Sequence, residues 1–143
     1  MVSVKIGIEW FLLLIMSIED YKTKKISVYL LVSFMLCGFG SRLLLNDRSM
    51  IYMSLFCSIW IGILGLIVYK VSKKGIGFGD IWLMTSLPFW ETGMRFFYIC
   101  ILSIVFSGLC SIFLYLKKSS NSEIAFVPWV GMAVFIYTVK GFL

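Results

Sequence analysis

The chain has 143 residues, of which 61% are hydrophobic and 14% are charged, and its mean hydropathy is +1.00. Soluble domains are usually about 45–50% apolar and about 25% charged, so this composition excludes an ordinary soluble protein. We predict an all-α, polytopic membrane bundle, with residues 1–143 forming a single membrane-embedded domain. The sequence has no histidine, which excludes Ser-His-Asp and Cys-His catalytic systems and HExxH zinc sites.

The remaining composition argues against several other classes of site. Four cysteines lie inside apolar runs without forming a CxxC pair, so we expect packing residues rather than a zinc or redox site: Cys37, Cys57, Cys100 and Cys110. The net charge is +6, but no basic stripe alternates with aromatic residues, so a nucleic-acid partner is not expected. No metal or other cofactor is expected, and the basic residues are assigned to topology and to contact with lipid headgroups.

Six apolar segments follow one another along the chain. The first, residues 6–18, is followed by Glu19 and Asp20 rather than by a cleavage site, so we expect a retained helix. The fourth, residues 81–90, contains Pro88 and would span only about 15 Å as a helix, half of the hydrocarbon core. It is either a half-helix packed within the protein or a locally thinned span. The other segments are residues 26–45, 50–69, 96–116 and 124–143.

The distribution of basic residues orients the predicted bundle. Eight of the 13 lysines and arginines lie after the first, third and fifth segments: Lys22, Lys24, Lys25, Lys70, Lys73, Lys74, Lys117 and Lys118. Because basic residues are enriched in cytoplasmic loops, this side is expected to be cytoplasmic and both termini to lie outside. Asp20 and Asp80 would then both lie at the cytoplasmic ends of their segments.

A glycine-rich stretch precedes the fourth segment. It runs Gly75-Ile76-Gly77-Phe78-Gly79-Asp80 and leads directly into apolar sequence. One interpretation is structural, with Asp80 as a helix N-cap after a flexible loop. The other is functional, because an acid at the edge of a membrane segment is costly, and glycines leave room for an extended peptide beside it.

Asp20 and Asp80 together favour the functional interpretation. Two carboxyl groups that approach closely cannot both ionise, so one keeps its proton, as an aspartic peptidase requires. Asp20 ends a helix and Asp80 begins one, so the dipoles of their own helices predict that Asp80 is ionised and Asp20 protonated. The lysines near Asp20 act in the opposite direction. The alternative for Asp20 is a solvated charge cluster with those lysines.

The motifs resemble those of type IV prepilin peptidases, which are GxGD membrane aspartic proteases. Gly77-Phe78-Gly79-Asp80 matches GxGD, and Asp20 followed by Lys24-Lys25-Ile26-Ser27 resembles the first acidic motif, an Asp followed by basic residues and Ile-Pro. A further match is the last-helix pattern apolar-Phe-x-Pro, at Ala125-Phe126-Val127-Pro128. Presenilins, which carry a Tyr-Asp motif in a preceding helix, match less well.

The resemblance implies an enzyme that cuts the basic leader from prepilin-like precursors on the cytoplasmic side, after a glycine and ahead of an apolar helix. Asp20 and Asp80 would be catalytic, with Gly77, Phe78 and Gly79 supporting the substrate. Trp82 stands where many members carry Lys, and Ser27 where many carry Pro. Since the chain has no paired CxxC motifs, it resembles the short forms without the methyltransferase part.

Two further acids and two other functions remain open. Glu9 is expected at the outer interface, although it could line a polar pocket or relay protons. Glu19 could replace Asp20 if the helix register is shifted. A small proton-coupled transporter would also use buried carboxylates, but transport sites tend to lie near the bilayer midplane. The other alternative is a non-catalytic assembly subunit.

Overall fold

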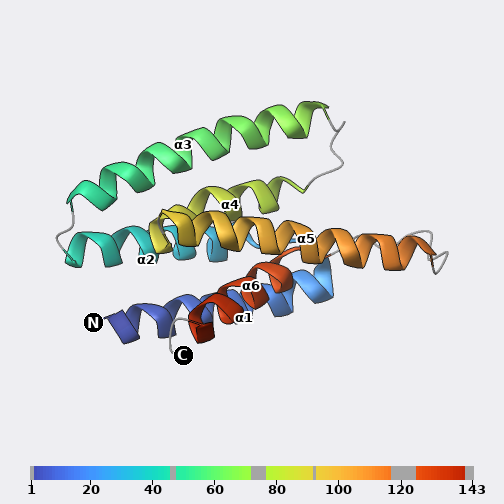
Figure 1. Ribbon diagram of the computed structural model, residues 1–143, viewed down its shortest axis with the longest axis horizontal. Helices are drawn as coiled ribbons and strands as arrows, with labels where there is room; N and C mark the ends of the chain where they lie inside the picture. Colours follow the sequence, from blue (N-terminus) through green and yellow to red (C-terminus); the bar gives the residue numbers. More distant parts are fainter. Residues whose placement is uncertain (1, 46–47, 72–76, 92, 117–124, 141–143) are drawn as a thin grey trace.

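The computed structural model describes residues 2–45, 48–71, 77–91, 93–116 and 125–140. Within these ranges the chain forms six helices and confirms the predicted order of segments (Figure 1). Lys73, Lys74, Gly75, Lys117 and Lys118 lie outside the described residues. The helices are α1 (Val2–Thr23), α2 (Val28–Leu44), α3 (Arg48–Val71), α4 (Phe78–Trp90), α5 (Met94–Leu116) and α6 (Val127–Lys140).

Successive helices run in opposite directions and form a membrane helical bundle. Figure 1 shows α1 (blue) beside α6 (red) along one edge and α3 (green) along the other. Helices α3 and α5 are long and apolar enough to cross a membrane, and most of their large side chains face outward. The alternation brings the end of α1 and the beginnings of α4 and α6 to the same end of the bundle.

The short helix α4 lies inside the bundle and packs chiefly against α3 and α2. Its 13 residues include Leu83, Leu87 and Trp90, which are almost completely buried. Helical backbone satisfies its own hydrogen bonds, so a half-length helix is tolerated when protein covers it. Of the two sequence-based options for this segment, the structure has the half-helix packed within the protein.

Helices α2 and α4 pack closely together at Gly38. The indole of Trp90 stacks on Phe34, with ring centroids 5.1 Å apart, and its Nε1 donates a 2.9 Å hydrogen bond to the carbonyl oxygen of Phe34. A Cβ on Gly38 would lie 2.6 Å from Trp90 Nε1 and 3.0 Å from Phe89 Cβ. Glycine therefore allows a close contact between these two helices.

Replacement of Gly38 by alanine is expected to destabilise the bundle by roughly 1–3 kcal/mol, as overpacking of a buried contact usually does. The matched control is Gly40→Ala on the same helix, where a Cβ would meet nothing within 4 Å. Alanine should be neutral or stabilising there, by up to about 1 kcal/mol of helix propensity. Thermal unfolding of the purified variants in detergent measures both changes in stability. Equal unfolding midpoints for Gly38→Ala and Gly40→Ala would contradict the prediction.

Candidate active site

Asp20 lies in the last turn of α1 and is buried, with 4% of its surface exposed. Its Oδ2 accepts a 2.9 Å hydrogen bond from the backbone N–H of Val127, the first residue of α6. The carboxyl group therefore points into the bundle toward the beginning of α6. Asp20 does not lie in a solvated cluster with the nearby lysines, Lys22, Lys24 and Lys25, which are exposed.

The connection between α1 and α2 is fixed by local hydrogen bonds. Lys24 has a left-handed backbone (φ 55°), and its N–H donates to the carbonyl oxygen of Asp20 at 2.9 Å, which ends α1. Glu19 Oε2 accepts from the backbone N–H of Ser27 at 3.0 Å, and Ser27 is the N-cap of α2. Glu19 thus ties the two helices together on a different face from Asp20, and the helix register is the predicted one.

Asp80 is the third residue of α4, so it is not the N-cap that the structural interpretation of the sequence required. The N-cap is Gly77, and the Gly77 N–H donates to the Asp80 carboxyl group. This is the return contact of a capping box, in which an acid at the third helical position satisfies the N-cap amide. The acid stabilises the beginning of α4, which lies at the same end of the bundle as the end of α1 (Figure 1).

The two acids interact electrostatically. Asp80 precedes the apolar segment 81–90, and its pKa is raised to about 6. Burial is the largest cause, the nearby Asp20 carboxylate also raises the pKa of Asp80, and the hydrogen bond from Gly77 lowers it. These are the conditions under which two carboxyl groups share one proton.

The contacts favour a proton order opposite to the one argued from the sequence. That argument counted only the dipole of each acid's own helix. Asp20 also receives an N–H from the beginning of α6, where the dipole favours negative charge. Asp80 has a raised pKa despite its place near a helix N-terminus, because burial and the Asp20 charge outweigh the hydrogen bond from Gly77. The Phe126-x-Pro128 pattern was the sequence signal that a helix begins there, but not that it meets Asp20.

A family model described as the type IV leader peptidase family matches residues 8–116 of this sequence. The chain belongs to the type IV leader peptidase family. The match includes Asp20 and Asp80 and extends to the end of α5, so α6 lies beyond it. No curated protein and no solved structure matches the chain significantly. Members of this family are aspartic-type prepilin leader peptidases of the membrane, so the protein is assigned as an enzyme of this type.

The glycines of the leader peptidase motif have separate structural roles here. Gly77 has φ −64°, which any residue adopts, but a Cβ there would lie 3.0 Å from Asp80 Oδ2. A Cβ on Gly79 would lie 3.3 Å from Ile26 Cδ1, so Gly79 lets α4 approach the α1–α2 connection. Phe78 is exposed between the rings of Tyr69 and Trp82. The motif thus shapes the surroundings of Asp80 and leaves one aromatic side chain at the surface.

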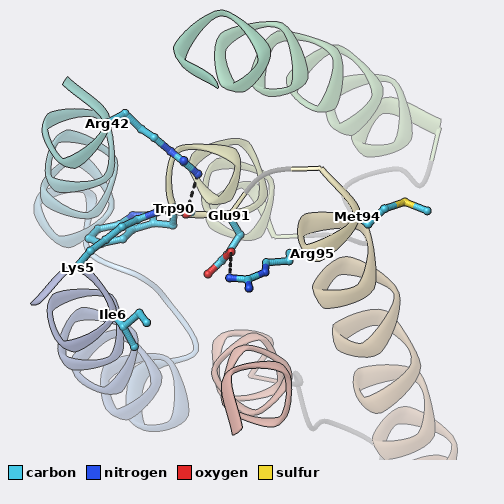
Figure 2. A pocket seen from close by; sticks show the side chains of 7 residues that line it. All are labelled: Lys5, Ile6, Arg42, Trp90, Glu91, Met94 and Arg95. Atoms are coloured by element: carbon cyan, nitrogen blue, oxygen red, sulfur yellow. Dashed lines mark hydrogen bonds and ion pairs between the residues drawn. The ribbon is translucent and has the colours of Figure 1, made fainter. Parts of the chain in front are cut away.

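The other end of this leader peptidase contains a second polar cluster, around a hollow of about 310 Å³ (Figure 2). Arg42 from α2 is buried and donates to the carbonyl oxygens of Phe89 at 2.9 Å and Trp90 at 3.0 Å. Lys5 from α1 also donates to the Trp90 carbonyl oxygen. These cations satisfy carbonyl groups at the C-terminal end of α4, where positive charge is favourable.

Glu9 was expected at the outer interface, and that prediction is wrong. Only 1% of its surface is exposed, because α1 turns this residue into the bundle. Its Oε1 has no hydrogen-bond partner among the described residues. Lys5 and Arg42 are near enough to act on it electrostatically. Their positive charges offset part of the cost of burying an acid there.

Proposed function

We propose that this peptidase removes the basic leader from prepilin-like precursors with Asp20 and Asp80 as its catalytic pair. The observation that carries the proposal is the placement of two motif acids at one end of the bundle, near enough that Asp20 raises the pKa of Asp80. Asp20 is buried and Asp80 is partly buried, which supports the proposal, since a carboxyl group withdrawn from water can keep a proton at working pH.

The proposed reaction is a direct attack by water on the scissile peptide bond. Ionised Asp20 takes a proton from the water, whose oxygen bonds to the carbonyl carbon. Protonated Asp80 donates its proton to the carbonyl oxygen, giving a neutral tetrahedral diol. Asp20 then passes its proton to the amide nitrogen as the C–N bond breaks, and Asp80 recovers a proton from the diol. The products are a carboxylic acid and an amine, and no covalent enzyme intermediate forms.

The proposed setting is a single domain, residues 1–143, with its catalytic end at the cytoplasmic face of the cell membrane. The distribution of lysines supports this orientation, because most of them follow the first, third and fifth segments. The substrate would present its basic leader at that face and keep its apolar helix in the membrane. The proposed partners are therefore prepilin-like proteins and membrane lipid.

Co-expression with a prepilin tests this function. A precursor with a basic leader, a glycine at the cut and an apolar helix after it is expected to be shortened by the leader, as measured by intact mass. The matched control is the same precursor with the cut-site glycine replaced by a bulky residue. The proposal would be refuted if the precursor kept its leader when this enzyme is fully expressed but lost it when another leader peptidase is expressed in its place.

The pH dependence of cleavage follows from the raised pKa of Asp80. The pKa of about 6 means that Asp80 keeps its proton below that pH and loses it above. Because the protonated form is the proposed acid, kcat/KM should fall as pH rises through about 6. The pH dependence of kcat/KM reports ionisations of the free enzyme. Because the two acids titrate together, the fall near pH 6 belongs to the pair rather than to Asp80 alone. A kcat/KM that rises steadily between pH 6 and 8 would contradict this assignment.

A further inference from the structure

The beginning of α6 makes a direct contact with a proposed catalytic acid. Val127 and Asp20 are 107 positions apart in sequence, yet the Val127 N–H donates to Asp20 Oδ2 at 2.9 Å. Both residues are buried, Val127 completely. A hydrogen bond between buried groups, one of them a carboxylate, is shorter and stronger than an exposed one.

The position of Val127 in the helix makes its amide available. Phe126 accepts hydrogen bonds from the N–H groups of Trp129 and Val130, so Val127 is the first residue inside the helix. The first amides of a helix have no partner within the helix and carry the positive end of its dipole. In α6 one of these amides, that of Val127, donates a hydrogen bond to the carboxylate of Asp20 on α1.

Other charged groups near Asp20 do not provide this contact. Asp80 of α4 is an acid and brings no positive charge to Asp20. Glu19 accepts a hydrogen bond from the backbone N–H of Ser27. The first turns of α2 and α6 contain no acidic residue. The cations on the same connection are exposed: Lys22, Lys24 and Lys25. The beginning of α6 is therefore the buried positive partner that the described contacts give Asp20.

We propose that the first turn of α6 is a positioning element for catalysis, in which the Val127 amide orients Asp20 and favours its ionised form. This inference rests on the proposed function and deepens it. Val127 acts through Asp20 and is a positioning residue rather than a catalytic one. It also gives α6, which lies beyond the residues matched to the family, a part in the reaction.

Val127→Pro tests the amide directly. Proline is favoured at the first helical position and removes the N–H, so the helix can still form although the buried valine side chain is also lost. We expect kcat/KM to fall roughly tenfold, and the acid limb of its pH profile to move upward by about one unit, because the carboxylate loses a stabilising hydrogen bond. Val127→Ala is the matched control: it loses side-chain packing but keeps the amide, and its acid limb should not move.

A second measurement does not depend on activity or on the folding of the proline variant. In protein labelled with ¹⁵N-valine, the Val127 amide resonance, assigned from its loss in Val127→Ala, should shift with pH as Asp20 titrates. The shift should be absent in Asp20→Asn. A resonance unaffected by pH, or an unmoved acid limb in folded Val127→Pro, would overturn the inference. If either result were found and Asp20→Asn still abolished cleavage, the positioning role of Val127 would be rejected and the proposed peptidase function would remain.

Discussion

Replacement of either Asp20 or Asp80 by asparagine is expected to lower the rate of leader cleavage by roughly 10²–10⁴-fold, the range for loss of a general acid or base. Asparagine has nearly the same size and can still hydrogen-bond, but it can neither take a proton from water nor donate a carboxylic proton. The loss should appear in kcat as well as in kcat/KM, because the proton transfers occur in the transition state.

Glu19→Gln is the matched control for this prediction. Glu19 is the neighbouring acid, and its Oε2 accepts a hydrogen bond from Ser27 rather than facing Asp80. Glutamine removes the same charge and keeps an oxygen acceptor, so most of the cleavage activity should remain.

The double variant Asp20→Asn/Asp80→Asn adds a second check. Groups that act as one unit give non-additive losses, so the double variant should be hardly slower than the worse single variant. Losses that multiply would indicate that the two acids act independently. Normal cleavage by either single variant would end the proposal of a catalytic pair.

Much of the fold followed from local sequence patterns, and the short fourth segment shows why. Ten apolar residues are too few to span the hydrocarbon core, so residues 81–90 were limited to two options. The choice between them depended on α2 and α3, which bury Leu83, Leu87 and Trp90. Such coverage is a property of the tertiary structure. The helix also begins earlier than predicted, at Phe78, because Asp80 satisfies the N-cap amide from inside the helix.

The two candidate acids could be named from the sequence, but their surroundings could not. The GxGD motif and the alternating helices placed Asp20 and Asp80 at one end of the bundle. The contact with Val127 was not predictable, because Val127 is distant in sequence and donates through its backbone, so its side chain carries no signal of the contact. The burial of Glu9 was missed for a related reason, because it depends on how α1 packs in the bundle, and Arg42, one of the cations that act on Glu9, lies on another helix.

The proposed catalytic pair and the cluster around Arg42 lie at opposite ends of the bundle. Asp80 lies in the first turn of α4, whereas Arg42 holds carbonyl groups at the opposite end of the same helix. Figure 2 shows the Arg42 side chain reaching from α2 toward Trp90. Since α4 carries Asp80, the Arg42 contacts fix the depth of the helix and should contribute to stability rather than to the chemical step.

Arg42→Met is therefore expected to destabilise the protein strongly and to leave cleavage by the folded fraction unchanged. Methionine preserves much of the apolar stem but loses both hydrogen bonds from a buried, charged donor. Such bonds contribute about 1.5–3 kcal/mol each, so a loss of roughly 3–6 kcal/mol is expected. The midpoint of thermal unfolding in detergent should fall by roughly 6–24 °C.

Arg95→Gln is the control for Arg42→Met, because it removes a positive charge from the same hollow. The Arg95 side chain is largely exposed, and its ion pair with Glu91 is 4.0 Å long. Exposed pairs of this kind contribute about 0–1 kcal/mol, so the midpoint should hardly change. A similar midpoint for both variants would mean that the charge of the hollow, and not the Arg42 hydrogen bonds, determines stability. A fall in kcat/KM of Arg42→Met at a temperature where it is folded would show that the two ends of α4 are coupled.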